Sequence, residues 1–378
     1  MNQLPVIFGY NINGTGNSSV PLSLCRYWNE AGLESTLYAP SRDSHVSYPW
    51  LQVAMGPLKK KFVYRFGGSG TPTRLAETYG LKHSANHSVV YLWAGLSMQV
   101  FEEAKKQGRK IVVERINCCQ ETARNILDNV YMSLDIEPDH GITEEAIATE
   151  GQKLDLADAI FCPSPMVRKS MIEAGIDEDK LLDASYGWSP ERFPSQRTEK
   201  SGNGSKVTYL FVGTLCVRKG VPLLLRSWEE AGIDGELIFV GAMDDTIRTH
   251  YGRYFERPDI THVPYTTDIG TYYEQADIFV FPSFEEGGPM VTYEAMAHGA
   301  LPLVSEMGAG AIVEHKINGL VLDQTVDAWC NAIMAVYKNR TRRAQLARAA
   351  VTRAYEFTWD KVAKRRADAL RGKFSGLW

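Results

Sequence analysis

The sequence lacks the features that mark several large protein classes. Its 378 residues contain no run of about 18 apolar residues, so we expect no membrane-spanning helix. The opening stretch "MNQLPVIFGY" has no basic residue ahead of its short apolar run, which is unlike a secretory signal peptide. A formal net charge of −4 disfavours nucleic acid as the main partner. These absences favour a cytoplasmic protein that does not act on nucleic acid.

Patterns of cysteine and of other metal ligands are also sparse. The six cysteines include no Cys-x-x-Cys pair, so neither a disulfide framework nor a zinc site is indicated, and we expect reduced thiols in the cytosol. They are Cys25, Cys118, Cys119, Cys162, Cys216 and Cys330. We interpret the remaining candidate ligands as surface residues and expect no metal. These are the pairs His83 and His87, Asp177 and Asp179, and Asp244 and Asp245.

Short apolar runs alternate with longer helix-like segments along the chain. The runs include "PVIFGY", "SVVYLW" and "KIVVER" in the first half and "KVTYLFVG", "ELIFVG" and "DIFVFPS" in the second. This alternation predicts an α/β fold whose parallel sheets are covered by helices on both faces. A polar stretch rich in Pro, Gly, Ser and Asn separates the halves and predicts a structureless linker. We therefore expect domains over 1–188 and 206–355, a linker over 189–205, and any chemistry between the halves.

The stretch "FPSFEEGGPMVTYEAMAHG" reads as the end of a strand, a turn and a helix. Gly287 and Gly288 form the turn, and Pro289 suits the first helical position. The N–H groups of Met290 and Val291 have no partner within the helix, and they lie at the positive end of the helix dipole. The sequence therefore predicts an anion site here, where the glycines allow a ligand to approach the main chain.

Two carboxylates flank this turn. Glu286 lies on the strand side, and Glu294 lies in the second turn of the helix, where its side chain leans back toward the helix N-terminus. Carboxylates accept hydrogen bonds from hydroxyls, so the pair suits a ligand with phosphate in its middle and hydroxyls at both ends, such as a nucleotide sugar. The alternative is that Glu294 is a solvated helix residue and that the glycines form an ordinary loop.

A basic loop follows another strand in the same half. In "YLFVGTLCVRKGVPLLLRSW" the strand ends at Gly213, the loop carries Arg218 and Lys219, and Gly220 permits a tight turn into the next helix. The adjacent Arg and Lys supply two positive charges where a diphosphate would lie. The alternative is a solvated basic pair on the surface.

Together these two motifs resemble those of the retaining glycosyltransferases of family 4, which have the GT-B fold. The similarity covers most of the chain and includes "DLADAIFCPSPMVRKSMIEAGI", "YGWSPERF", "YYEQADIFVFPS" and "NGLVL". It implies two doubly wound Rossmann-like domains that face each other across a cleft, the first on the acceptor side and the second binding the nucleotide sugar. It also implies a final helix over 356–378 that crosses back to pack on the first domain.

The resemblance further implies roles for individual residues. Glu286 would bind hydroxyls of the donor sugar near the reaction centre, and Arg218 and Lys219 would hold the diphosphate. Glu294 would bind the ribose hydroxyls. The other donor contacts implied are Gly288, Pro289, Met290 and Val291 at the helix start, Gly213 and Val263 at strand ends, and Asn13, Gly14, Thr15 and Gly16 in a loop of the first domain.

Three positions depart from the family pattern. Gly288 and Pro289 stand where many members have Phe-Gly, and Thr214 stands where an Arg is frequent. In "VVERINCCQET" the His that members often present is absent, and Asn117 is the nearest candidate for its place. Asn117 is able to donate a hydrogen bond to the donor sugar but not to transfer protons at neutral pH.

The function implied by the resemblance is transfer of a sugar, with retained anomeric configuration, from a UDP- or GDP-sugar to a hydroxyl of a saccharide or lipid-linked glycan. The family context suggests assembly of cell-surface polysaccharide or lipopolysaccharide. No metal cofactor is expected, because the two cations and the helix start already neutralise the diphosphate. Open alternatives are an inactive nucleotide-sugar-binding protein and a GT-B epimerase or hydrolase. A nicotinamide dehydrogenase is disfavoured, because "NINGTGNSS" lacks the third glycine of its fingerprint and "STLYAP" ends without an acidic residue.

Three basic segments are interleaved with apolar residues: "GPLKKKF", "EEAKKQGRK" and "KVAKRRADALRGKFSGLW". One interpretation is peripheral contact with an anionic membrane, at its inner face, that presents a lipid-linked acceptor. The other is that these segments are solvated helix faces. The sequence leaves both open.

Overall fold

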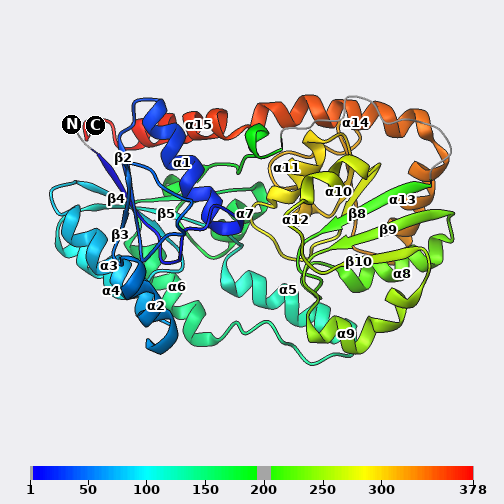
Figure 1. The fold of residues 1–378 in the computed structure, drawn as a ribbon, viewed down its shortest axis with the longest axis horizontal. Coiled ribbons are helices and arrows are strands. Elements are labelled where there is room, and N and C mark those ends of the chain that lie inside the picture. The colour runs from blue at the N-terminus through cyan, green and yellow to red at the C-terminus, as the bar shows by residue number, and fades with distance from the viewer. Residues whose placement is uncertain (1–2, 194–205, 378) are drawn as a thin grey trace.

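The computed structural model describes residues 3–193 and 206–377, which form two α/β lobes lying side by side (Figure 1). The N-terminal lobe has a parallel sheet of seven strands in the order β3-β2-β1-β4-β5-β6-β7. Its strands are β1 (Leu4–Ile7), β2 (Ser35–Ala39), β3 (Leu51–Val53), β4 (Val89–Trp93), β5 (Lys110–Glu114), β6 (Ala159–Cys162) and β7 (Leu181–Asp183). Its helices are α1 (Ser19–Glu30), α2 (Pro57–Phe66), α3 (Thr71–His83), α4 (Met98–Lys106), α5 (Gln120–Ser133), α6 (Glu144–Leu156) and α7 (Pro165–Glu173).

The C-terminal lobe repeats this plan with a parallel sheet of six strands in the order β10-β9-β8-β11-β12-β13. The strands are β8 (Val207–Val212), β9 (Gly235–Val240), β10 (Ile260–Val263), β11 (Ile278–Phe281), β12 (Leu301–Val304) and β13 (Leu320–Val321). The helices are α8 (Val221–Ala231), α9 (Asp245–Tyr251), α10 (Ile269–Gln275), α11 (Met290–Ala297), α12 (Glu306–Ala309), α13 (Val326–Lys338) and α14 (Arg340–Ala354). This is the expected α/β fold class, with two doubly wound parallel sheets in series.

Both sheets have a point at which the strand order reverses. In the first sheet β1 pairs with β2 on one side and with β4 on the other, and in the second sheet β8 lies between β9 and β11. The strands at these points are apolar and almost wholly buried, as in parallel sheets covered on both faces. Loops that leave the carboxyl ends of two such neighbouring strands diverge to opposite faces and leave a crevice between them. Because β8 and β11 are adjacent parallel strands, the loop after β8 and the turn after β11 lie at the same edge of the sheet, on either side of this crevice.

The last helix, α15 (Trp359–Lys373), continues from α14 along the top edge of both lobes, so that the two chain ends lie close together in Figure 1. It packs on α1, and the indole of Trp28 donates to the carbonyl of Ala363 at 2.9 Å. Arg366 of this helix is buried and donates to both carboxylate oxygens of Glu114, at 2.7 and 3.2 Å. The C-terminal end of the chain is thus an integral part of the N-terminal lobe.

The segment between the sheets is more ordered at its start than the sequence indicates. Residues Pro190–Arg192 form a short 3-10 helix, and Phe193 after them is buried, so the expectation of a structureless stretch from residue 189 is wrong for these residues. Arg26 of α1 holds this turn through Glu191 at 2.7 Å. The remainder of the predicted linker, 194–205, lies outside the described residues.

Candidate functional site

The basic loop and the acidic turn meet at the carboxyl ends of β8 and β11. Gly220 makes this contact possible, because its φ of +73° is left-handed and a Cβ there would collide with the carbonyl of Pro282. The main chain of Phe284 donates to the carbonyl of Arg218 at 2.8 Å, which fixes the two loops against each other. The resulting cluster holds two cations, Arg218 and Lys219, and two carboxylates, Glu285 and Glu286.

Lys219 contacts the carboxylate of Glu286 directly. Burial, followed by the positive charge of Arg218, lowers the pKa of Lys219 to about 7. The carboxylate of Glu286 works in the opposite direction, since it favours the charged ammonium. The pKa of Lys219 lies below the usual value for lysine, because the ammonium is buried next to a second cation.

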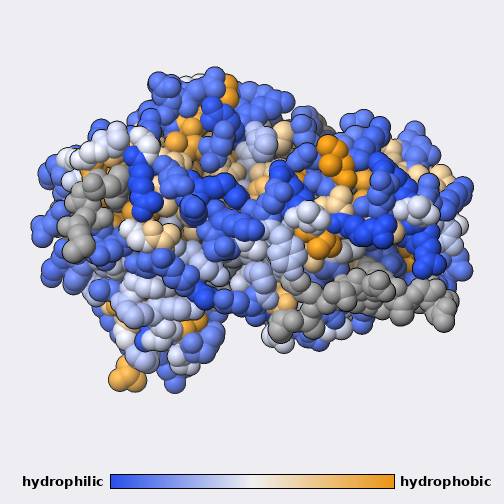
Figure 2. All heavy atoms as spheres, turned by 90° about the horizontal axis from the view of Figure 1, so that it is seen from above, coloured by the Kyte–Doolittle hydropathy of each residue, from blue (hydrophilic) through white to orange (hydrophobic). Residues whose placement is uncertain are grey.

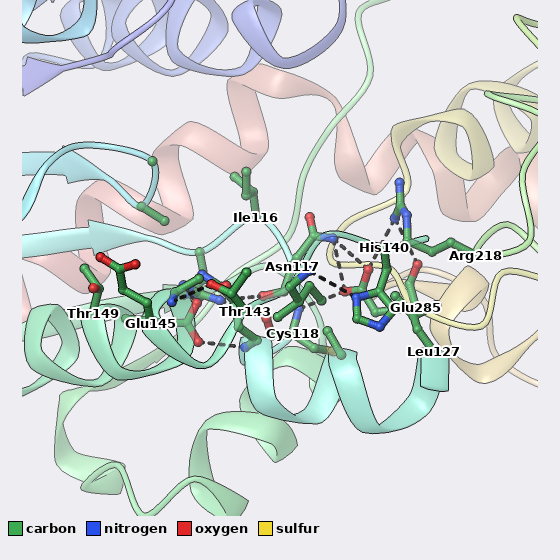
Figure 3. Close-up of a pocket in the computed structure, with 18 of the residues that line it drawn as sticks. Ile116, Asn117, Cys118, Leu127, His140, Thr143, Glu145, Thr149, Arg218 and Glu285 are labelled. Atoms are coloured by element: carbon green, nitrogen blue, oxygen red, sulfur yellow. Dashed lines mark hydrogen bonds and ion pairs between the residues drawn. The ribbon is translucent and has the colours of Figure 1, made fainter. Parts of the chain in front are cut away.

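Glu285 is the residue of the cluster that the sequence analysis missed. It is 1% exposed, and Arg218 lies 3.3 Å from one of its carboxylate oxygens. The amide of Asn117, from the loop after β5, donates to both oxygens at 2.8 and 3.1 Å, and the main chain of Cys118 adds a bond of 3.2 Å. Figure 3 shows Asn117 and Arg218 converging on Glu285 from the two lobes. Asn117 therefore reaches the cluster, although its partner in this structure is a carboxylate.

The turn after β11 packs against the other lobe. A Cβ at Gly287 would collide with the main chain of Ile116 and Asn117, and one at Gly288 would lie 2.7 Å from the ring of Tyr186. We had expected these glycines to leave room for a ligand at the main chain. Instead, the space beside both residues is filled by the N-terminal lobe, so their small size serves contact between the lobes.

Helix α11 begins one residue later than its sequence indicates. Pro289 is the residue before the helix and not its first residue, and it is buried. Met290 and Val291 are half-buried and lie in the first turn, where their N–H groups have no partner within the helix. The sulfur of Met290 lies 3.9 Å from the hydroxyl of Ser19, at the start of α1. The start of α11 thus faces the start of α1 across the lobes.

The loop before α1 is closed by its own side chains. Gly14 has a φ of +81° and donates its N–H to the hydroxyl of Ser18 at 3.0 Å. The side-chain oxygen of Asn13 accepts from the hydroxyl of Ser18 at 2.6 Å and from the N–H of Thr15 at 3.0 Å. Gly16, with a φ of +51°, begins the 3-10 turn that leads into α1. The expected glycine loop is therefore a fixed turn next to the start of α11.

Glu294 is buried and forms a second polar group, separate from the lysine cluster. One of its carboxylate oxygens accepts from Tyr273 at 2.8 Å, and the other accepts from Arg192 at 3.1 Å. Burial raises the pKa of Glu294, and the positive charge of Arg192 and then the hydrogen bond of Tyr273 oppose that rise. Arg192 and Tyr273 lie in the quoted stretches "YGWSPERF" and "YYEQADIFVFPS", but the sequence analysis gives neither of them a role.

The two remaining candidates lie at strand ends of the second sheet. Val263 closes β10, and its carbonyl accepts from the N–H of Gly241 at 2.9 Å. Gly213 follows β8, with a φ of +143°, and its carbonyl lies where a Cβ at Gly241 would collide with it. Both candidates are thus on the carboxyl edge of the sheet, and their main-chain hydrogen bonds join neighbouring strand ends.

The main cavity adjoins the cluster on the side of the N-terminal lobe. Its volume is about 820 Å³, and Asn117, Arg218 and Glu285 line one end of it (Figure 3). The other walls come from α5, α6 and the segment between them, with side chains such as Lys153. Lys219, Glu286 and Glu294 are not among the lining residues. The predicted donor residues therefore border this cavity only through Arg218 and Asn117.

The cavity wall contains a buried ion pair. Arg115 and Glu150 lie 2.7 Å apart, and Arg115 also donates to the carbonyl of Cys118 at 2.8 Å. Burial lowers the pKa of Lys153, whose ammonium lies 5.8 Å from the ring centre of Phe101. Lys153 and Phe101 both line the cavity.

All six cysteines lie in the described part of the chain, and all are free. Burial raises the pKa of the Cys118 thiol to about 12, so this thiol beside the cluster is neutral and unreactive. Within residues 3–193 and 206–377, no three His, Cys, Asp or Glu side chains gather closely enough to hold a metal ion. No helix in these ranges is long and apolar enough to cross a membrane.

Comparison with known proteins identifies the lobe that carries the cluster. The family model "Glycosyl transferases group 1" matches residues 206–339. The matched residues include Arg218, Lys219, Glu285, Glu286 and Glu294, whereas Asn117 and Gly14 belong to the other lobe.

Relatives of known name match parts of the chain. A D-inositol 3-phosphate glycosyltransferase of Pseudarthrobacter chlorophenolicus is 31% identical over 207 residues, which are 50% of this chain and 49% of that protein. For this and other curated relatives, the chain spans between about a third and a little over half of the relative's length. The chain thus resembles glycosyltransferases over part of its length.

Solved structures match the whole arrangement. Sucrose-phosphate synthase of Thermosynechococcus elongatus superimposes with a TM-score of 0.75 at 18% identity and covers 99% of this chain and 100% of its own. The Anabaena protein HepE, in complex with UDP and glucose, gives a TM-score of 0.66 at 13% identity and covers 98% and 100% of the two chains. Because these sequence identities are low, the similarity shows the fold alone. The chain has the GT-B fold.

Proposed function

We propose that this chain transfers a sugar from a nucleoside diphosphate to a hydroxyl, with retention of anomeric configuration. The observation that carries the proposal is the cluster in the part of the chain that matches the group 1 family model, where Lys219 and Arg218 meet Glu286 at the switch point of the second sheet. Ligands of doubly wound sheets bind at such points. UDP is present in the complex of HepE, and a nucleoside diphosphate has the charge that the two cations match.

The cations would act on the leaving group. Departure of a nucleoside diphosphate builds negative charge on its terminal phosphate, and fixed positive groups stabilise that charge in the transition state. Arg218 and Lys219 occupy the loop tip, and the first N–H groups of α11 lie across the turn from them. When the diphosphate enters, it would take over Lys219 from Glu286 and free that carboxylate for the hydroxyls of the donor sugar.

Glu294 would bind the ribose. Tyr273 and Arg192 bind different carboxylate oxygens of Glu294. Glu294 is therefore able to keep its bond to Tyr273 and to accept a ribose hydroxyl at the oxygen that Arg192 now contacts. The side chain of Arg192 is 39% exposed and therefore free to turn away into solvent. When the donor binds, the ion pair between Arg192 and Glu294 would be replaced by a hydrogen bond from a ribose hydroxyl to Glu294.

The acceptor would occupy the cavity beside the cluster. This cavity reaches Arg218 and Glu285 from the N-terminal lobe, so an acceptor bound there would lie beside the proposed diphosphate site. Its volume of about 820 Å³ is that of a ligand site for one or two sugar units. A saccharide, free or lipid-linked, is the acceptor class that we propose. We also propose that the reaction serves the assembly of cell-surface polysaccharide or lipopolysaccharide. We propose the cytoplasm as the location, because free thiols suit a reducing compartment.

A panel of UDP- and GDP-sugars, with and without saccharide acceptors, tests this proposal. We expect acceptor-dependent release of UDP or GDP, unchanged by EDTA because no metal is part of the proposal. The anomeric proton coupling in the product, measured by NMR, reports retention, and an inverted product would contradict that part. Release of neither nucleotide with any donor would contradict transfer.

A second candidate is a nucleotide-sugar-binding protein without transferase activity. It is favoured by Asn117, which stands where the resembling family often has a His and which is bound to Glu285 in this structure. Such a protein would show a rise in melting temperature with a nucleotide sugar but no turnover. A GT-B epimerase or hydrolase would instead convert the donor in the absence of any acceptor.

A further inference from the structure

Helix α2 exposes a row of large apolar side chains. Leu58, Phe62 and Phe66 are 88%, 66% and 66% exposed, and they follow one another at intervals of four residues, which places them along one face of the helix. The rings of Phe62 and Phe66 lie 5.2 Å apart. Val63, on an adjoining face of the helix, is buried. The row of Leu58, Phe62 and Phe66 is thus mostly exposed, and its two rings pack on each other rather than in the core.

The same helix is strongly basic. Lys59, Lys61 and Arg65 flank the apolar row, while Lys60 turns inward to Asp43 at 2.7 Å. No Asp or Glu occurs between Asp43 and Glu77 in the sequence, so no acidic neighbour along the chain offsets these charges. A helix with an apolar row and flanking cations suits the surface of an anionic membrane, where charged headgroups cover an apolar interior.

The other two basic segments named in the sequence analysis have structural partners. Lys105 and Lys110 both pair with Asp158, at 2.6 and 3.0 Å. In the last segment Arg366 is buried against Glu114. Seen from above, the surface is mainly hydrophilic, with hydrophobic residues in separate patches (Figure 2). Within the described residues of the three segments, α2 alone combines flanking cations with an exposed apolar row.

We propose that α2 docks the protein on an anionic lipid bilayer. Leu58, Phe62 and Phe66 enter the boundary between headgroups and acyl chains, and Lys59 and Lys61 lie against the phosphates. The helix lies at the lower edge of the N-terminal lobe in Figure 1, where its outer face is open to such a surface.

Docking at α2 would place the proposed acceptor side next to the bilayer. Asp43, which holds Lys60, also accepts from Asn11 at 3.0 Å, and Asn11 precedes the glycine loop before α1. The hydroxyls of Tyr64 in α2 and Ser41 lie 3.3 Å apart. The helix is thus joined to the loop that leads into α1, and a lipid-linked acceptor would approach the N-terminal lobe from this side without leaving the membrane. This last step rests on the proposed function, whereas binding to the bilayer does not.

Cosedimentation with vesicles of phosphatidylglycerol and of phosphatidylcholine tests the proposal. We expect the full chain to bind the anionic vesicles, more weakly as salt rises, and to leave the neutral ones in solution. The variant L58S/F62S should lose most of this binding. The variant K59Q/K61Q should weaken it roughly twentyfold, since each basic residue near an anionic surface contributes about fivefold.

The matched control is M132S, which removes an apolar side chain that is 68% exposed on α5, away from α2. It should bind vesicles like the unchanged protein. Circular dichroism and binding of a nucleotide sugar in solution show whether each variant is folded and whether the donor site is intact, so failure of docking is separable from failure of the proposed function. No vesicle binding at low salt, or equal binding by all variants, would overturn the proposal. The proposal would also be overturned if the unchanged protein self-associated instead of binding vesicles and L58S/F62S lost that self-association.

Discussion

At the scale of single residues, Lys219 decides how the site responds to pH. Its pKa is lowered to about 7 by burial and by Arg218, so the ammonium of the free protein loses its proton as the pH rises through the neutral range. Only the protonated form attracts a diphosphate. The affinity for a nucleotide sugar should therefore fall as the pH rises above about 7, whereas a lysine with the usual pKa of 10.5 would show no such fall below pH 9.

Calorimetric titration with a UDP- or GDP-sugar between pH 6 and 9 measures this effect. The intact nucleotide sugar is chosen because its phosphodiester groups do not titrate in this range. The control is K219R, whose guanidinium stays charged, so its affinity should be independent of pH. The same pH dependence in both proteins would show that another group titrates.

The residues of the cluster differ in how far their sequence predicts them. The contact between Lys219 and Glu286 follows from the strand order, because loops after adjacent parallel strands meet at one edge. Glu285 was not predicted, since two adjacent carboxylates are indistinguishable until the turn shows which one faces the other lobe. Arg192 was missed for a similar reason: its role depends on a contact with Glu294 between segments far apart in sequence.

At the scale of elements, the turn between β11 and α11 links the two lobes. Gly287 packs on the main chain of Ile116, so replacement by Ala forces the lobes apart at this point. We expect G287A to lose about 1–3 kcal/mol of unfolding free energy, as is usual for overpacking, together with part of its donor affinity. Urea unfolding and calorimetry measure the two effects.

The matched control for this turn is G151A. Gly151 lies in α6 with open space around its Cα, so an added methyl meets nothing and should be neutral or stabilising by up to about 1 kcal/mol. Equal stability of G287A and G151A would mean that the lobes are not packed at the turn as described.

The last helix depends on one buried ion pair. Arg366 is 1% exposed and its partner Glu114 is fully buried, so R366M leaves an uncompensated carboxylate in the first lobe. We expect a loss of about 3–5 kcal/mol in urea unfolding. The control R371M removes an arginine of the same helix that is 41% exposed and should change stability by less than about 1 kcal/mol. A small effect of R366M would show that α15 is not held by this pair.

Element boundaries were predictable where a chemical signal marks them. The strands were recognisable from their buried apolar runs, and the start of α11 was displaced by only one residue because Pro289 takes the position before the helix. The cavity between α5 and α6 was not predicted, because its walls come from helices whose sequences carry no motif. The 3-10 turn at Pro190–Arg192 was also missed, since Pro and Ser suit a linker equally well.

At the scale of the whole molecule, sequence and structure agree on two doubly wound lobes, and the structure adds how closely they meet. Asn117 and Glu285 join the lobes beside the cluster, and Arg192 and Glu294 add a second contact. Periodicity predicts each sheet, but the fit between the lobes depends on side chains from both halves. The proposed donor must therefore enter a site whose carboxylates are already paired.

Transfer by E286Q tests the central claim most directly. The account assigns Glu286 to the donor sugar and the cations to the diphosphate. E286Q should therefore keep its affinity for UDP or GDP within about threefold. Its rate of transfer should fall at least about a hundredfold, as for loss of one transition-state contact. The measurement is acceptor-dependent nucleotide release by the unchanged protein and by E286Q, with nucleotide affinity measured alongside. A rate for E286Q close to that of the unchanged protein would contradict the account.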